Sequence, residues 1–290
     1  MDAIRVAVTR GEIVEAVHIV HAAAVRNGAL VASAGDPGLV AFFRSSAKPL
    51  QALPVVRARD DLDDRDLAIA SASHLATLEQ LGAVRALLAK APATEDDLEC
   101  GAGEDRLLHN CSGKHAGMLA LCRARGWPTE NYRLLEHPVQ QACLAAVAEA
   151  AEVDPGTMPI GVDGCGVPTF ALSLEQMAGS FARLESLEGG ARVAAAMRAQ
   201  PDLVRGPIAA DSRLMRALPG WTAKGGAEGL ICASSPDGLG VALKCMDGAY
   251  RPLESALNSF LASLGVELPE AGPEIVRNSR GEPVGEVVLL

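Results

Sequence analysis

Ser45 and Lys48 lie three residues apart in the segment FRSSAKP, a spacing that places both side chains on one face of a helix. A serine hydroxyl attacks an acyl carbon when a neighbouring base takes its proton, and a lysine that burial keeps neutral is such a base. The adjoining Arg44 would favour the neutral form of that lysine through its positive charge. On these residues alone, the alternative is that Ser45 or Ser46 caps the helix and Lys48 is solvated.

A second serine, Ser73, lies in the segment SASH, between an apolar run and an expected helix. Ser73 and His74 fit a second hydroxyl relay, although the same residue types are common in turns and caps. Further along, Lys244 interrupts the apolar segment VALKCM. A lysine that faced inward there would lose solvation and tend to be neutral, whereas one that faced outward would stay charged. The sequence leaves both orientations open.

Two glycine-rich segments indicate close approach of the backbone to a ligand or a neighbouring element. In GVDGCG, Asp163 is placed where its carboxylate could receive an ammonium group of a small substrate. In AKGGAEG, Lys224 and Gly225 resemble the third motif of penicillin-recognising enzymes. The alternative for the second segment is a plain glycine-rich turn.

The seven cysteines include no CxxC pair, and an odd number scattered in this way does not indicate a disulfide framework. Cys111 begins an expected helix, and a helix N-terminus favours the thiolate form. Cys165 lies too far from it for the usual spacing of structural zinc sites, so spacing alone does not predict a metal. We therefore expect reduced thiols.

The composition limits the classes of function. The chain has 290 residues, 49% hydrophobic and 21% charged, which is enough for a sizeable core. A formal charge of -10 and only 3% aromatic residues argue against a nucleic-acid partner and favour a small polar ligand. The N-terminal residues do not resemble a signal peptide, and no apolar stretch reaches the length of a membrane span. We expect a cytoplasmic protein that does not bind membranes.

Periodicity predicts the elements that must position these residues. Apolar runs broken by turn signals indicate antiparallel strands over residues 3–43, with Asn27-Gly28 as a hairpin turn. Helical spacing predicts a mainly helical insert over about residues 45–218. Strand-like runs return in GLICASS and GLGVALKCM, followed by a helix at about 252–264 and a strand-like tail. We predict a single α+β domain, residues 1–290, in which an antiparallel sheet from both chain ends packs against a mainly helical lobe.

Nine segments, in order over about residues 8–249, resemble the rhizobial-type L-asparaginases, also called the asparaginase II family. They are VTRGEIVEAVH, FFRSSAKPLQALPVV, IASASH, LHNCSGKHAGMLAL, HPVQQA, GVDGCGVPTFALSL, MRALPG, AKGGAEG and GLGVALKCMDGA. The resemblance implies a serine β-lactamase-like fold, hydrolysis of L-asparagine to L-aspartate and ammonia, and a homodimer. It also implies two Ser-Lys pairs, Ser45 with Lys48 and Ser73 with Lys244, in which the serine closest to the substrate is the nucleophile.

The resemblance further implies one zinc ion per chain, held together with water by Cys111, Lys114 and Cys165, that aids substrate positioning. Asp163 matches a substrate-binding acid of the family. With it we expect three further residues in the substrate site: Arg44, Gly164 and Gly225.

The chain departs from the family pattern directly after the second serine, where SHLATLEQ replaces an SHSGE-like run. A loop near the substrate is therefore expected to differ, and Ser71 competes with Ser73 for the second role. Two other functions stay open. A penicillin-recognising serine amidase or peptidase would keep the Ser-x-x-Lys element, although the absence of an export signal weighs against it. A catalytically silent amino-acid-binding protein would keep only the pocket at Asp163.

Overall fold

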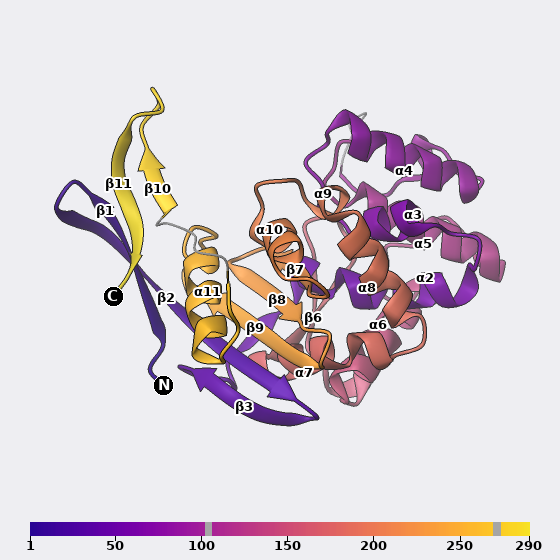
Figure 1. Ribbon diagram of the computed structural model, residues 1–290. Coiled ribbons are helices and arrows are strands. Elements are labelled where there is room, and N and C mark those ends of the chain that lie inside the picture. Colours follow the sequence, from indigo (N-terminus) through magenta and orange to yellow (C-terminus); the bar gives the residue numbers. More distant parts are fainter. Residues whose placement is uncertain (102–105, 269–273) are drawn as a thin grey trace.

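Strands from the two ends of the chain lie on one side of the molecule, and most of the helices from the middle of the chain lie on the other (Figure 1). The computed structural model describes residues 1–101, 106–268 and 274–290. The arrangement confirms the predicted α+β class, in which an antiparallel sheet is built from both chain ends. Within the described ranges, no helix is both long enough and apolar enough to cross a lipid bilayer.

The main sheet has eight strands, seven of them in the order β10-β11-β1-β2-β9-β8-β7, while β3 pairs with β2. Every pairing is antiparallel. The strands are β1 (Ile4–Arg10), β2 (Ile13–Arg26), β3 (Ala29–Ala34), β7 (Thr222–Gly226), β8 (Leu230–Ser234), β9 (Leu239–Cys245), β10 (Glu274–Arg277) and β11 (Pro283–Leu289). The hairpin β1-β2 therefore lies between strands from the later part of the chain.

The turn between β2 and β3 forms as its sequence predicts. Asn27 and Gly28 both have positive φ, 52° and 74°. Positive φ at both central residues is the requirement of a type I′ turn, which matches the twist of the flanking strands and is met most easily by Asn-Gly. This dipeptide alone therefore determines the connection.

The region between the two parts of the sheet is mainly helical, as predicted, but it also contains a small separate sheet of order β4-β6-β5. Of its strands, only β4 lies within the predicted strand region, residues 3–43, and periodicity did not indicate β5 and β6. Its strands are β4 (Val40–Phe42), β5 (Ile160–Val162) and β6 (Pro168–Ser173). Gly161 explains the close packing here, because a Cβ on it would lie 2.9 Å from Cζ of the Phe42 ring. The helices are α1 (Lys48–Gln51), α2 (Leu53–Ala58), α3 (Asp64–Ala70), α4 (Leu78–Lys90), α5 (Ser112–Arg125), α6 (Pro138–Ala151), α7 (Leu174–Arg183), α8 (Gly190–Ala199), α9 (Pro201–Val204), α10 (Ala210–Ala217) and α11 (Leu253–Ser263).

Helix α7 holds the sheet against the helical region, since it packs on β2, β8 and β9 and also on α6. It starts at a capping box in which Ser173 and Gln176 satisfy each other's backbone N–H groups. The approach to β9 is close: a Cβ on Gly240 would lie 2.0 Å from the carbonyl oxygen of Ala178. The glycine at this strand position is therefore required by the packing of the helix.

Candidate active site

Lys48 is the first residue of α1 and is fully buried. Its Nζ donates hydrogen bonds to Ser73 Oγ, at 3.0 Å, and to the carbonyl oxygen of Ala72. Burial lowers the pKa of Lys48, and the positive charge of Lys114 acts in the same direction, whereas negative charge at Cys111 and Cys165 opposes the shift. The structure therefore joins a serine hydroxyl to a lysine that tends towards its neutral, basic form.

This pairing differs from the one predicted, since Lys48 bonds to Ser73 and, within the described residues, makes no hydrogen bond to Ser45. Ser45 lies in the short 3-10 helix η1 (Arg44–Ala47), whose N-terminus has no side-chain cap, so the capping alternative is not observed. Arg44 has a φ of 48°, which is unusual for a residue with a side chain and turns the chain sharply before Ser45. The neighbouring Ser46 is buried and donates to the carbonyl oxygen of Lys224 at 2.8 Å.

Lys224 on β7 is the second fully buried lysine. Its Nζ donates to the Gly225 carbonyl oxygen at 2.7 Å and lies 3.5 Å from Asp211 Oδ2. Burial lowers the pKa of Lys224 to about 7; the carboxylate of Asp211 opposes this shift, and the charge of Lys48 adds to it. The sequence indicates Lys224 only through the Lys-Gly-Gly pattern of a glycine-rich motif, and it does not predict that this lysine is buried beside Lys48.

Lys244, the predicted partner of Ser73, is instead half-exposed near the end of β9. Its Nζ donates to the Cys245 carbonyl oxygen at 2.5 Å. Burial lowers the pKa of Lys244, and negative charge at Cys245, Glu228 and Asp247 opposes the shift. The predicted pairing of Ser73 with Lys244 is therefore not found, because the position of Lys244 on β9 leaves its side chain half-exposed and away from the buried site. It is β7, not β9, that brings a lysine into the interior.

Asp163 lies in the turn between β5 and β6, where its Oδ1 accepts a hydrogen bond from Arg44 Nε at 2.9 Å and from the Gly164 N–H at 2.7 Å. Burial acts to raise the pKa of this carboxyl, but the charges of Lys114 and Arg44 outweigh it and the pKa is lowered. The side chain remains 10% exposed. A charged carboxylate at this depth, with its second oxygen not bonded to either group, is suited to an ammonium group.

Cys111, Lys114 and Cys165 converge next to Asp163 although they come from α5 and the β5-β6 turn. Lys114 Nζ donates to Cys165 Sγ at 3.2 Å. A hydrogen bond from Cys111, together with the charge of Lys114, lowers the pKa of Cys165 to about 5 despite burial. Burial also acts to lower the pKa of Lys114, but negative charge at Cys165 and Cys111 outweighs it and raises that pKa. Two sulfurs and one nitrogen, all buried, form a donor set that fits zinc.

Three other buried cysteines differ from Cys165 in the direction of their pKa shift. Burial raises the pKa of Cys100, Cys122 and Cys143 to about 12 in each case. An inert buried cysteine behaves in this way, whereas the thiol of Cys165 is held in its charged form. Of the four thiols compared, Cys165 is therefore the one that favours the thiolate form.

The segment SHLATLEQ, which departs from the family pattern, is held by hydrogen bonds, beginning with its first two residues. The N–H of Ser73 donates to the Val204 carbonyl oxygen at 2.8 Å, and His74 Nε2 shares a hydrogen bond with Ser112 Oγ at 2.7 Å. Burial, with the charge of Lys48, lowers the pKa of His74 to about 4, so its ring is neutral. The neighbouring Ser71 has a buried hydroxyl with no hydrogen-bond partner among the described residues, which favours Ser73 as the second serine.

The end of this loop forms the start of α4. Thr77 and Gln80 make a capping box, and the side-chain oxygen of Gln80 also accepts from the Leu75 N–H at 2.9 Å. The amide nitrogen of the same side chain donates to the Asp202 carbonyl oxygen at 2.8 Å. The altered sequence therefore encodes an ordered helix start that also contacts α9.

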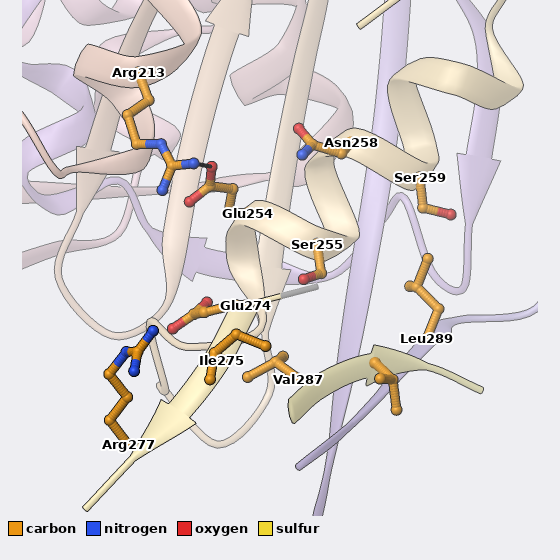
Figure 2. Close-up of a pocket in the computed structure, with 11 residues that line it drawn as sticks. Arg213, Glu254, Ser255, Asn258, Ser259, Glu274, Ile275, Arg277, Val287 and Leu289 are labelled. Atoms are coloured by element: carbon orange, nitrogen blue, oxygen red, sulfur yellow. Dashed lines mark ion pairs between the residues drawn. The ribbon is translucent and has the colours of Figure 1, made fainter. Parts of the chain in front are cut away.

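A cavity of about 500 Å³ is lined by Asp211 and Gly225, which contact Lys224. Leu75, Arg205 and Tyr250 are among its other lining residues, and the converging lysines and thiols do not line it. A Cβ on Gly225 would lie 2.9 Å from an Arg205 guanidinium nitrogen and 3.2 Å from Asp211 Oδ2, so a larger residue there would require the Arg205 side chain to move. Figure 2 shows a different cavity, of about 600 Å³, between α11 and the hairpin β10-β11, with the ion pair Arg213–Glu254 at one side. None of the converging lysines and thiols lines that second cavity.

Comparison with known proteins places these residues in context. Among solved structures, the chain resembles Mglu in its native form with a TM-score of 0.51 and 11% identity, over 90% of this chain and 69% of that one. A β-lactamase from Mycobacterium bovis gives 0.41 and 14% identity, over 85% and 95%, and SurE with D-Leu gives 0.43 and 15%, over 93% and 82%. The comparison with curated proteins finds no match. A model of the family described as L-asparaginase II matches residues 6–289, and the protein therefore belongs to this family of amidohydrolases.

Proposed function

We propose that the protein hydrolyses L-asparagine to L-aspartate and ammonia through a serine-bound acyl intermediate. The observation that carries this proposal is the fully buried Lys48, whose Nζ lies 3.0 Å from Ser73 Oγ next to a second buried lysine, Lys224. Burial of two lysines costs solvation energy, and burial lowers the pKa of both, with the charge of Lys48 adding to the shift of Lys224. Such an arrangement is typical of proton transfer rather than of structural support.

We assign the nucleophile to Ser45. It adjoins Arg44, whose guanidinium is bonded to Asp163, so a substrate ammonium group held by Asp163 would bring its side-chain amide close to this serine. Ser45 Oγ would attack the amide carbon and lose its proton to the lysine pair. The same proton would then pass to the leaving nitrogen, which departs as ammonia.

Ser73 and Lys48 would act together as the proton carrier. In the second half of the reaction a water molecule replaces the amine, gives its proton to the same carrier and releases L-aspartate from the serine ester. One water is consumed for each ammonia and aspartate formed, so the atoms balance. Protonation of Lys224 and protonation of Lys48 would oppose each other, because two ammonium groups so close together are unfavourable, so the pair would carry one proton at a time.

The zinc ion implied by the family resemblance would be held by Cys111, Lys114 and Cys165. When bound, it would supply a positive charge for orienting the substrate. Lys114 must lose its proton to become a ligand, so zinc binding and protonation of this lysine compete. The resemblance also implies a homodimer, and the exposed apolar side chains on β2 and β3 support this proposal; they are Val17, Ile19, Leu30 and Val31.

The experiment is ammonia release from L-asparagine, combined with mass spectrometry of enzyme quenched during turnover. We expect an added mass equal to the aspartyl group on the peptide that contains Ser45, and no such mass in Ser45→Ala. Label on Ser73 instead would reassign the nucleophile. Calorimetry that detects L-asparagine binding by a folded protein with no ammonia release would reject hydrolysis and indicate a binding protein.

A further inference from the structure

His18, Cys245 and Asp247 form a second cluster of potential metal ligands, on strands that the proposed mechanism does not use. One potential ligand atom from each of the three lies within 4.8 Å of the others. His18 Nδ1 lies 2.6 Å from Asp247 Oδ2, and Cys245 Sγ donates to Asp247 Oδ1 at 2.9 Å. The three side chains belong to two of the segments that carry the family resemblance, VTRGEIVEAVH and GLGVALKCMDGA.

The register of β2 and β9 creates this cluster. Val20 pairs with Cys245, so His18, two residues earlier on β2, lies on the same face beside the turn that follows β9. β2 and β9 are adjacent in the sheet (Figure 1). The turn itself is held by its backbone, because the N–H of Ala249 donates to Asp247 Oδ1 at 3.0 Å. Two positions come from strands and one from a tight turn, so the backbone brings all three residues together without an ion.

Two of the three residues in this cluster are buried, which distinguishes it from a group of exposed acidic side chains. Cys245 is fully buried and His18 is 9% exposed, whereas the Asp247 side chain is 50% exposed. Among the described residues, His18 Nε2 is buried without a hydrogen-bond partner. The contact with Asp247 directs Nδ1 towards the cluster, and the half-exposed side of Asp247 leaves room for water as a fourth ligand.

We propose that His18, Cys245 and Asp247 bind one divalent cation of the zinc class, distinct from the zinc ion assigned to Cys111, Lys114 and Cys165. Imidazole nitrogen, thiolate sulfur and carboxylate oxygen are the three ligand types that zinc accepts in proteins. Binding would release the Cys245 thiol proton to solvent, so that thiolate and carboxylate together balance the charge of the ion.

The distances allow an ion with little movement. Zinc–ligand bonds of about 2.0–2.3 Å in a tetrahedron place the ligand atoms about 3.3–3.7 Å apart. The present hydrogen-bond distances of 2.6 and 2.9 Å must therefore open by about 1 Å or less. Asp247 is the side chain that can move, since it is the exposed one. The ion would connect β2 to the end of β9 and so stabilise the sheet independently of catalysis.

The test is zinc content per chain after equilibration of the full-length protein with a fixed, low concentration of free zinc. Wild-type protein and Cys245→Ala are compared by elemental analysis, with Cys122→Ala as the control because it removes an equally buried thiol on α5. We expect Cys245→Ala to hold one zinc fewer per chain and Cys122→Ala to match the wild type. Equal content in all three would overturn the proposal.

A second variant, Asp247→Asn, keeps the proposal testable if Cys245→Ala does not fold. Asp247→Asn changes an exposed carboxylate, and circular dichroism checks that each variant is folded. With Co²⁺ as the probe, we expect thiolate-to-metal absorption from this site to persist in Cys111→Ser/Cys165→Ser and to be lost when Asp247→Asn is added. Absorption that disappears already with the Cys111 and Cys165 changes would mean that only the first site binds metal.

Discussion

Asp211 is expected to set the pH at which the lysine pair becomes active, and Asp211→Asn tests this directly. The Asp211 carboxylate is buried, lies 3.5 Å from Lys224 Nζ and accepts a hydrogen bond from the Gly225 N–H at 2.8 Å. Asparagine has the same shape and can still accept that backbone bond. The substitution therefore removes the charge and leaves β7 in place.

The magnitude follows from the distance. At 3.5 Å and an effective dielectric constant of about 20, one charge stabilises the other by about 5 kcal/mol, or about three pKa units. Neighbouring groups and water can rearrange and compensate for part of the lost interaction, so we expect the pKa of Lys224 to shift by about one to three units. Because the carboxylate raises the pKa of Lys224, its removal lowers that pKa below the present value of about 7.

The assay is kcat/KM for ammonia release, measured across pH. If neutral Lys224 is required, activity of the wild-type enzyme should rise with pH through an apparent pKa of about 7. In Asp211→Asn this rise should move to lower pH. Asp202→Asn is the control, since Asp202 is exposed and pairs with Arg216. A rise that stays at the same pH in Asp211→Asn would refute the role given to the Asp211–Lys224 pair.

Four further results are expected. Lys48→Met and Ser73→Ala should each remove nearly all ammonia release, and the double variant should lose no more than either, because the two groups act as one carrier; additive losses would separate them. Lys244→Met should keep kcat within about threefold of wild type in steady-state assays, since its Nζ bonds only to the Cys245 carbonyl oxygen; a loss like that of Lys48→Met would return Lys244 to the mechanism. Lys224 should add a rise to the unfolding free energy, measured in urea, between about pH 7 and pH 10, because its pKa is lowered on folding; the buried thiols with raised pKa values act in the opposite direction, so the wild type is compared with Lys224→Met. Lys224→Met should lack that part of the slope, and an unchanged slope would contradict the lowered pKa. Gly240→Ala should lower the unfolding free energy by about 2 kcal/mol or more through the 2.0 Å contact with the Ala178 carbonyl oxygen; Gly82→Ala, whose Cβ would meet nothing within 4 Å, is the control.

Local sequence determined several features of this protein without help from the fold. Asn27-Gly28 formed the predicted hairpin turn because its backbone preference is a property of two residues. The return of strands after the helical region was equally visible, since apolar runs and turn residues are read within ten positions or so. The order of nine segments likewise indicated the family, which the match over residues 6–289 confirmed.

The tertiary structure decided which of these residues meet. Lys244 interrupts an apolar strand and Lys224 lies in a glycine-rich one. The Lys-Gly-Gly pattern drew attention to Lys224, but neither strand sequence determines which lysine is buried. In the sheet, Lys224 pairs with Cys232 and Lys244 with Leu230, and only the first is fully buried. Lys48 likewise reaches Ser73 rather than the serine three positions before it. The physical reason is that burial and contact depend on the register and packing of segments far apart in the chain, and a slip of one residue would turn each strand side chain to the opposite face.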